Sequence, residues 1–564
     1  MLVLICSIFL GMYFSFKFWY WACKKHWTAR VALVLIIILF GAWYYRRIHN
    51  SCKGWEYGIG GSKIDNQNGE CIIPTPNYCE LAIRDGLLNF AAFGQECDAQ
   101  NMLFNKDQLP ESLKHRQNMK KLGYPRPENW PNEMKYKESL YKKKVHANVI
   151  DMNDPDVPTH VKDNIEITVD ITNHKSHRIE VDVKRNDTRA EELKIIREQV
   201  LRQDEIDGNT ERVDHNVLIL YIDNLSRAHF HRKMKELDGW LDQFTEDKNA
   251  ELEATEFMRY HTVSKNTYKS NNAMYYGESA ELNYNETTNV FRHFSKNGYI
   301  TGMFRDECDY SAALFDDKLK RPHFYNWDHY GSTIACDTNY DRGNTRNLVL
   351  DSGRNSQYKR CLYGKGLHEI QLDYLTQFWE AYPDVRKVFR TSMSYAHEFT
   401  GELIKYADSD YVDLLQNFYE KGYLDDTQVI IVSDHGAHFL TTRTNVFPDD
   451  SRRMENALPL LISLTPRSVS DKNLEILRKN QQQFLNSHDI YATLKSFAVG
   501  KTASSEDVID YSFFHEELPK RRDCDTKICD NCTHPVYGNP WCHLDSSKTQ
   551  ARFDEKSYFY FSPW

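Results

Sequence analysis

The 564-residue sequence has no excess of positive charge. Its 71 lysine and arginine residues are outnumbered by 80 aspartate and glutamate residues, and the formal net charge is −9. Domains that bind a nucleic-acid backbone concentrate lysine and arginine on one face, so this balance argues against nucleic acid as a partner. The chain is too long for one ordinary domain and predicts a large domain with appendages. An aromatic content of 13% is typical of a folded protein.

The 13 cysteines lack the paired CxxC spacing of a zinc ribbon. Cys6 and Cys23 lie in the apolar N-terminal stretch, and the others fall into three groups, at positions 52–97, 308–361 and 524–542. Such grouping is typical of local disulfides in an oxidising compartment. The last group holds a single CxxC, so disulfides are favoured over a zinc site there. Because the number outside the N-terminal stretch is odd, one cysteine is left over.

Neither apolar run near the N-terminus has the length of an ideal membrane span, about 20 residues. Lys17 interrupts the first run, residues 2–23, and the second covers residues 31–45. No small-residue cleavage site follows either run, which disfavours a removed signal peptide. We expect residues 1–50 to form a membrane anchor, either a two-helix hairpin or a single signal-anchor helix. Either arrangement places the rest of the chain in the lumen or outside the cell.

Sequons at Asn186, Asn285 and Asn531 agree with that placement and predict a glycoprotein. Residues 51–210 are polar and rich in turn residues, and we expect them to form a disulfide-tied accessory region. Within them, IEITVDI and HRIEVDV alternate apolar and polar residues and predict a half-buried β-hairpin. The end of the chain, residues 516–564, is predicted to be a cysteine-rich tail.

From residue 213, apolar runs of strand length alternate with amphipathic segments of helical character. The predicted strands lie within 216–223, 298–309, 387–397, 427–436 and 457–466, and the clearest helical segments are 369–382, 411–424 and 487–497. This alternation predicts an α/β/α sandwich with a mostly parallel central sheet. We assign this catalytic domain to residues 211–515.

Two of the predicted strands end in carboxylates. NVLILYID ends at Asp223, and TQVIIVSDHG carries Asp434 and His435 before Gly436, which lets the backbone turn. Open α/β sheets hold their ligands at the carboxyl ends of their strands. Two aspartates and a histidine suit a divalent cation such as zinc or manganese. Asn224-Leu-Ser is also a sequon, but we expect it to be unmodified because it lies against this site.

The segments NVLILYIDNLSR, KNTYKSNNAMYYGE and DDTQVIIVSDHG, in that order, resemble the alkaline-phosphatase-like superfamily. This superfamily contains phosphatases, phosphodiesterases, sulfatases and phosphoethanolamine transferases. Within it, the chain is most similar to a metazoan family of membrane-anchored ectoproteins that shares the DNLSRAHF, GYIT, LDDT and SDHG signatures and a C-terminal cysteine cluster. The resemblance covers residues 70–545 and implies the superfamily's fold.

The resemblance also implies a role for each motif residue. Asp223, Asp434 and His435 correspond to ligands of one metal ion, and Thr267 corresponds to a nucleophile at the start of a helix that contacts the same ion. A metal ion lowers the pKa of such a hydroxyl, and helix N-terminal amides help to bind the anion. Asn266 would donate to the same oxyanion. Attack by Thr267 gives a covalent intermediate that water or an acceptor alcohol resolves.

A second metal site is in doubt. His397 follows a predicted strand, where the superfamily places either a ligand of a second metal or a substrate-binding histidine, and both roles stay open. The two-metal pattern has an aspartate four residues earlier, but Met393 stands there. His438 lies just beyond SDHG on a predicted rim loop, where it could meet an anionic substrate. Asp306 either lines the pocket or caps a helix.

The sequence therefore predicts a metal-dependent hydrolase or transferase that acts on a phosphoric ester through Thr267. The alternative is a catalytically inactive ectodomain that serves as a binding module, which the incomplete second site would favour. A sulfatase-like hydrolase is less favoured, because no Cys/Ser-x-Pro-x-Arg motif stands at the nucleophile position. The substrate is expected to be a phosphorylated or sulfated ester, but residues 306–390 carry no motif that identifies it.

Overall fold

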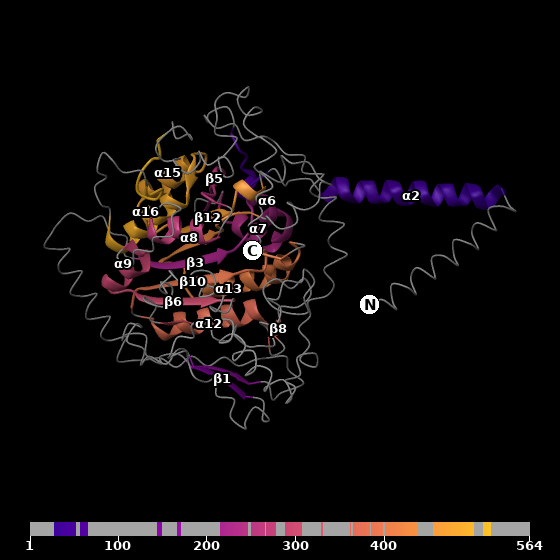
Figure 1. The fold of residues 1–564 in the computed structure, drawn as a ribbon. Helices are drawn as coiled ribbons and strands as arrows, with labels where there is room; N and C mark the ends of the chain where they lie inside the picture. The colour runs from indigo at the N-terminus through magenta and orange to yellow at the C-terminus, as the bar shows by residue number, and fades with distance from the viewer. Residues whose placement is uncertain are drawn as a thin grey trace, which may run out of the picture.

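A computed structural model shows how the chain folds (Figure 1). The structure describes residues 27–51, 57–65, 144–148, 166–170, 215–245, 250–264, 267–277, 288–306, 329–330, 361–362, 365–383, 385–398, 401–436, 455–500 and 511–519.

The core is a seven-stranded sheet with the order β4-β12-β11-β3-β10-β6-β7. Its strands are β3 Asn216–Ile222, β4 Leu252–Glu256, β6 Ile300–Arg305, β7 His329–Tyr330, β10 Lys387–Met393, β11 Thr427–Val432 and β12 Leu461–Pro466. The strands from β11 to β7 pair in parallel, whereas β12 is antiparallel to both of its neighbours. The predicted α/β class with a mostly parallel sheet is confirmed.

Helices cover both faces of this sheet. One face carries α8 Thr267–Tyr276, α9 Val290–Lys296 and α16 Ser487–Val499, and the other carries α7 Lys235–Asp242, α12 Leu367–Ala381 and α13 Asp408–Glu420 (Figure 1). The domain also contains α6 Arg227–Lys233, η7 Leu403–Ala407 and α15 Asp471–Asn480. Because both faces are covered, β3 reads as a continuous apolar run, and every residue of it is buried.

Several small elements complete the described structure. The short pairs are β5 Tyr260–His261 with β13 Leu485–Asn486, β8 Cys361–Leu362 with β9 Lys365–Gly366, and β1 Lys144–Asn148 with β2 Glu166–Asp170. The strand β2 lies within the predicted segment IEITVDI, but its partner is β1, which the sequence pattern did not indicate. The predicted partner HRIEVDV lies outside the described residues, as do the three sequons Asn186, Asn285 and Asn531.

The N-terminal helix α2 Trp27–Ser51 contains the second apolar run and extends away from the sheet (Figure 1). Its apolar side chains are exposed, for example Leu39 at 67%. Among the described residues, no helix combines the length and the apolarity that crossing a membrane requires. The first apolar run, residues 2–23, and the predicted tail beyond residue 519 lie outside them.

A short N-terminal segment, residues 57–65, is hydrogen-bonded to the domain. It contains the helical turn η1 Ile59–Gly61, in which the Ile59 amide donates to Glu256 Oε2 at 2.7 Å and the Gly60 amide to Asp242 Oδ1 at 2.7 Å. Gly60 has φ of 63°, a left-handed conformation that glycine adopts without strain. Part of the predicted accessory region is therefore attached directly to the α/β domain.

Glu256 also belongs to a buried ionic cluster around His231 of α6. His231 donates through Nε2 to Glu256 Oε1 at 2.8 Å and through Nδ1 to Asp238 Oδ2 at 2.9 Å. Burial alone lowers the pKa of His231, but the two carboxylates raise it to about 9. Burial raises the pKa of Glu256, but His231 and Arg227 bring it down to about 2. The cluster is therefore built on a protonated imidazole.

Replacing this imidazole should change how stability depends on pH. A raised folded-state pKa gives stability that is complete below the unfolded value and lost as pH rises through the folded value. The wild-type free energy of unfolding should therefore contain a contribution from His231 that disappears between pH 6.5 and about 9. His231→Gln should lack that contribution and be less stable by about 3 kcal/mol at pH 6. Urea unfolding of the two proteins at several pH values measures this free energy of unfolding. If it changes equally with pH in the wild type and in His231→Gln, the assigned contribution of His231 is wrong.

Candidate active site

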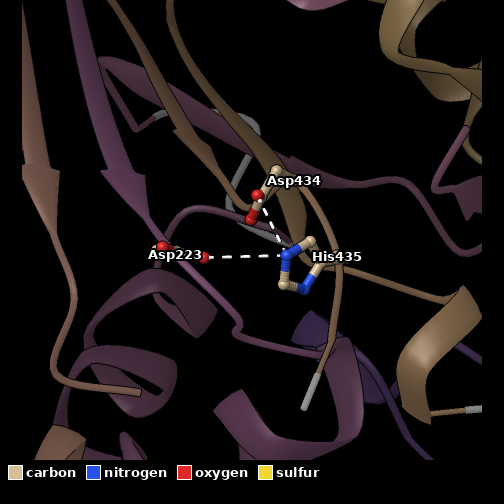
Figure 2. A group of neighbouring side chains, drawn as sticks. All are labelled: Asp223, Asp434 and His435. Atoms are coloured by element: carbon tan, nitrogen blue, oxygen red, sulfur yellow. Dashed lines mark ion pairs between the residues drawn. The ribbon is translucent and has the colours of Figure 1, made fainter. Parts of the chain in front are cut away.

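The parallel pairing of β3 with β11 brings the predicted metal ligands together. Asp223 follows β3, and Asp434 and His435 follow β11 after Ser433, so the three side chains meet at the same edge of the sheet (Figure 2). His435 Nε2 lies 3.3 Å from Asp434 Oδ2 and 3.8 Å from Asp223 Oδ1. One ligand atom of each residue lies within 4.8 Å of the others, and all three residues are buried.

The tautomer of His435 fits a cation at this place. Its Nδ1 is 3.0 Å from the carbonyl oxygen of Gly436, which can only accept a hydrogen bond, so Nδ1 carries the proton. The other ring nitrogen, Nε2, is the one that faces the two carboxylates. Asp434 Oδ2 is buried and receives no hydrogen bond from the described residues. A divalent cation would be attracted to all three groups, so the residues present fit a zinc or manganese ion.

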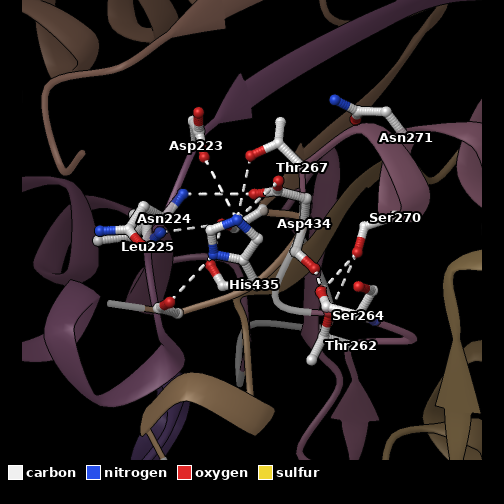
Figure 3. A network of polar contacts seen from close by, with 12 residues as sticks. Asp223, Asn224, Leu225, Thr262, Ser264, Thr267, Ser270, Asn271, Asp434 and His435 are labelled. Atoms are coloured by element: carbon white, nitrogen blue, oxygen red, sulfur yellow. Dashed lines mark hydrogen bonds and ion pairs between the residues drawn. The ribbon is translucent and has the colours of Figure 1, made fainter. Parts of the chain in front are cut away.

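Thr267 lies beside this group. It is the first residue of α8, and its Oγ1 is 3.1 Å from His435 Nε2 (Figure 3). The side chain is partly exposed, whereas those of Asp434 and His435 are fully buried. The hydroxyl is therefore placed where it could bind the same cation or lose its proton to the imidazole. Asn266 and His438, which the sequence also nominated, lie outside the described residues.

Backbone and hydroxyl contacts hold the Asp434–His435 turn in place. Thr262 donates from Oγ1 to the Asp434 carbonyl at 2.7 Å, and Ser433 donates from Oγ to the His435 carbonyl at 2.9 Å (Figure 3). A Cβ on Gly436 would lie 1.7 Å from the Glu455 carbonyl oxygen, so only glycine fits there. Glu455 itself forms an ion pair with Arg232 and serves the structure.

Asn224 connects the two sides of the site. Its backbone amide donates to Asp434 Oδ1 at 3.3 Å, and its side-chain Nδ2 donates to the Ala396 carbonyl oxygen at 2.7 Å. It has φ of 68°, and no other described residue except glycine has a positive φ. Asparagine tolerates this conformation better than most residues. With 1% of its surface exposed, it is inaccessible to glycosylation in the folded protein, in line with the expectation from the sequence.

His397 lies at the edge of the site on a firmly held turn. Its ring centroid is 6.5 Å from that of His435, and it is less buried than its neighbours in the turn. Asp306 accepts hydrogen bonds from the amide and the hydroxyl of Ser394, at 2.6 and 2.9 Å. Asp306 therefore fixes the turn that presents His397. Met393, which replaces the expected aspartate, packs against Tyr411 of α13, with 3.5 Å between the hydroxyl and Sδ.

A buried arginine lies below the acidic group, on the face covered by α8. Arg390 of β10 is stacked between the rings of Tyr221 and Tyr275. Burial raises the pKa of both tyrosines, the Asp434 carboxylate adds to the rise, and the Arg390 guanidinium opposes it. Both phenols are therefore within electrostatic reach of the arginine and of Asp434.

The fold and these side chains define a class: an α/β protein with a buried carboxylate–histidine group and an adjacent hydroxyl at the rim of a mostly parallel sheet. The chain belongs to the family described as "Protein of unknown function (DUF229)", whose model matches residues 95–531. A comparison with curated proteins finds no match.

Several solved structures are similar to the chain. The lipoteichoic acid synthase LtaP from Listeria monocytogenes is 13% identical, with a TM-score of 0.34 over 54% of this chain and 79% of its own. The C-terminal periplasmic domain of EcEptC from Escherichia coli, in complex with Zn, is 12% identical, with a TM-score of 0.37 over 55% of this chain and 89% of its own. A protein in the alkaline phosphatase superfamily from Vibrio parahaemolyticus is 13% identical, with a TM-score of 0.32 over 51% of this chain and 67% of its own.

The backbone at Asn224 can be tested by comparing two substitutions. Alanine and glycine both remove the hydrogen bond to Ala396, but only alanine is strained at φ of 68°. Asn224→Ala should therefore lower the free energy of unfolding by about 1 kcal/mol more than Asn224→Gly does. Asn297, with φ of −98°, is the matched control, and there alanine should be at least as stable as glycine. Urea denaturation measures all four variants, and the same order at both positions would rule out strain at Asn224.

Proposed function

We propose that this protein is a metal-dependent hydrolase or transferase of phosphoric esters, with Asp223, Asp434 and His435 as metal ligands and Thr267 as the nucleophile. The observation that carries the proposal is the 3.1 Å approach of Thr267 Oγ1 to His435 Nε2, within a group of buried acidic ligand atoms. Hydroxyls are weak nucleophiles unless a base or a metal ion activates them. A cation held by Asp223, Asp434 and His435 would supply this activation to Thr267.

The chain's own residues would perform the remaining steps. A bound zinc or manganese ion would lower the pKa of the hydroxyl and neutralise an ester oxygen. Thr267 Oγ1 would attack phosphorus and release its proton to solvent, the bond from phosphorus to the leaving oxygen would break, and that oxygen would take up a proton from solvent to leave as an alcohol. The amides at the start of α8 would donate to the phosphoryl oxygens, since they are the first of the helix. Water or an acceptor alcohol would then release the phosphoryl group from Thr267.

His397 would contact the substrate. It lies at the edge of the group of proposed metal ligands. Four residues earlier, where the two-metal pattern has an aspartate, Met393 packs on the other face of the sheet and offers no carboxylate for a second metal. An imidazole held at this distance could donate to a phosphoryl or leaving-group oxygen. His438 and Asn266 keep their proposed substrate and oxyanion roles. Membrane attachment and a lumenal or extracellular location also remain predictions of the sequence.

Removing one ligand should abolish metal binding. Asp434→Asn should lower the affinity for Zn²⁺ or Mn²⁺ at least about a hundredfold, because a buried charged ligand is lost. Asp426→Asn is the matched control: it makes the same change at the other end of β11, where the side chain is 48% exposed. Metal content of the purified proteins and competition with a chelator measure the effect. A wild type that binds neither ion would leave only the binding-module alternative.

The nucleophile can be tested separately. Thr267→Ala should lower kcat at least about a thousandfold, since the group that attacks phosphorus is removed. Thr267→Ser keeps a hydroxyl at the same place and should retain measurable turnover. Hydrolysis of a panel of phosphomonoesters, phosphodiesters and sulfate esters provides the assay. Equal turnover in Thr267→Ala and Thr267→Ser would exclude a threonine nucleophile, and turnover of sulfate esters alone would refute the proposed substrate class.

A further inference from the structure

Arg390 is a buried cation on the same sheet face as the proposed metal ligands. Its Cζ lies 4.3 Å from the ring centroid of Tyr221 and 4.5 Å from that of Tyr275, and Nη1 is 3.9 Å from Met303 Sδ. The residue is 7% exposed, and its Nε makes no hydrogen bond with the described residues. In the part of the chain that the structure describes, no carboxylate forms an ion pair with it.

Two aromatic rings do not fully compensate such a charge. Cation–π contacts contribute about 2 kcal/mol when desolvated, whereas an unpaired buried charge costs several times more. The compensating negative charge therefore has to act from further away. Arg390 pairs in register with Ile219 of β3, and Asp223 follows four residues later, on the same face because side chains alternate along a strand. The adjacent strand β11 leads to Asp434 on this face.

We propose that Arg390 is a fixed counter-charge that limits how tightly the Asp223–Asp434–His435 group holds a divalent cation. The inference rests on the proposed function, because it requires this group to bind a cation. Before the ion binds, the guanidinium offsets the repulsion between the two adjacent carboxylates. Once the ion is bound, the same positive charge opposes it, because charges interact strongly across a buried, weakly polar region.

A counter-charge role and a purely structural role of Arg390 predict opposite changes in cation affinity when the charge is removed. If Arg390 only supported the fold of the site, a neutral side chain would loosen the ligands and weaken cation binding. If it is a counter-charge, a neutral side chain of similar length removes a repulsion and strengthens cation binding. Replacing a buried charge by a well-packed apolar side chain is often neutral for stability, so the variant can be compared with the wild type.

Lys387 provides a matched control on the same strand. It is also a buried cation stacked on an aromatic ring, with Nζ 5.0 Å from the Trp379 centroid. It lies at the opposite end of β10 from the site, and its side chain packs on the α12 face. Lys387→Met therefore removes the same charge from the same strand without removing a charge from the site.

The experiment measures the affinity of the full chain for Zn²⁺ and Mn²⁺ by competition with a chelator. Arg390→Met should bind both ions about tenfold more tightly than the wild type, a change equivalent to about 1.4 kcal/mol. Arg390→Lys, which keeps the charge, and Lys387→Met should stay within about twofold of the wild type. Thermal unfolding without metal checks that each variant is folded.

The outcomes separate the two proposals. A wild type that binds neither ion refutes the proposed function itself. A wild type that binds, together with a folded Arg390→Met that binds equally or more weakly, overturns the counter-charge alone. If Arg390→Met does not fold, Arg390→Gln takes its place with the same expectation. Failure of both neutral variants to fold would assign Arg390 to the fold and would overturn the inference as well.

Discussion

The pairing of β3 with β11 is the constraint on which the site depends. Parallel strands end at the same edge, so each delivers its following residue to the same place. Asp223 and Asp434 are thereby brought together although they stand far apart in the sequence. The helix α8 then begins at Thr267 beside them, which adds a hydroxyl and the N-terminal end of a helix. A shift in the register between these two strands would separate Asp223 from Asp434 and His435.

Much of this arrangement could be predicted from local patterns. Apolar runs ending in aspartate indicate buried strands, and these strands and the helices α12, α13 and α16 lie where the sequence placed them. The strand β4 was missed because its sequence, LEATE, is short and contains two glutamates. Those glutamates are buried, with Glu256 paired to His231 and Glu253 to Arg478. No single-sequence pattern reveals partners that distant, and the antiparallel direction of β12 was equally invisible.

Only part of the site could be predicted from the sequence. Motif resemblance could nominate the ligands, but it says nothing about the residues that hold them. Asn224 becomes important only through its φ and through a contact with Ala396, which lies on another strand's loop. Arg390 appears in the sequence only as one of four polar residues in β10, KVFRTSM. Its placement between two tyrosines depends on the register of β10 against β3 and on the packing of α8.

The attachment of residues 57–65 bears on how small a self-sufficient fragment of this protein can be. The segment donates backbone amides to Glu256 and Asp242, and Asp65 accepts from Arg259 at 2.5 Å. A fragment trimmed to the α/β domain at residue 211 would remove these contacts from Glu256, Asp242 and Arg259 at once. The natural lower limit is therefore near residue 57. Any recombinant fragment should retain this segment together with the α/β domain to which it is hydrogen-bonded.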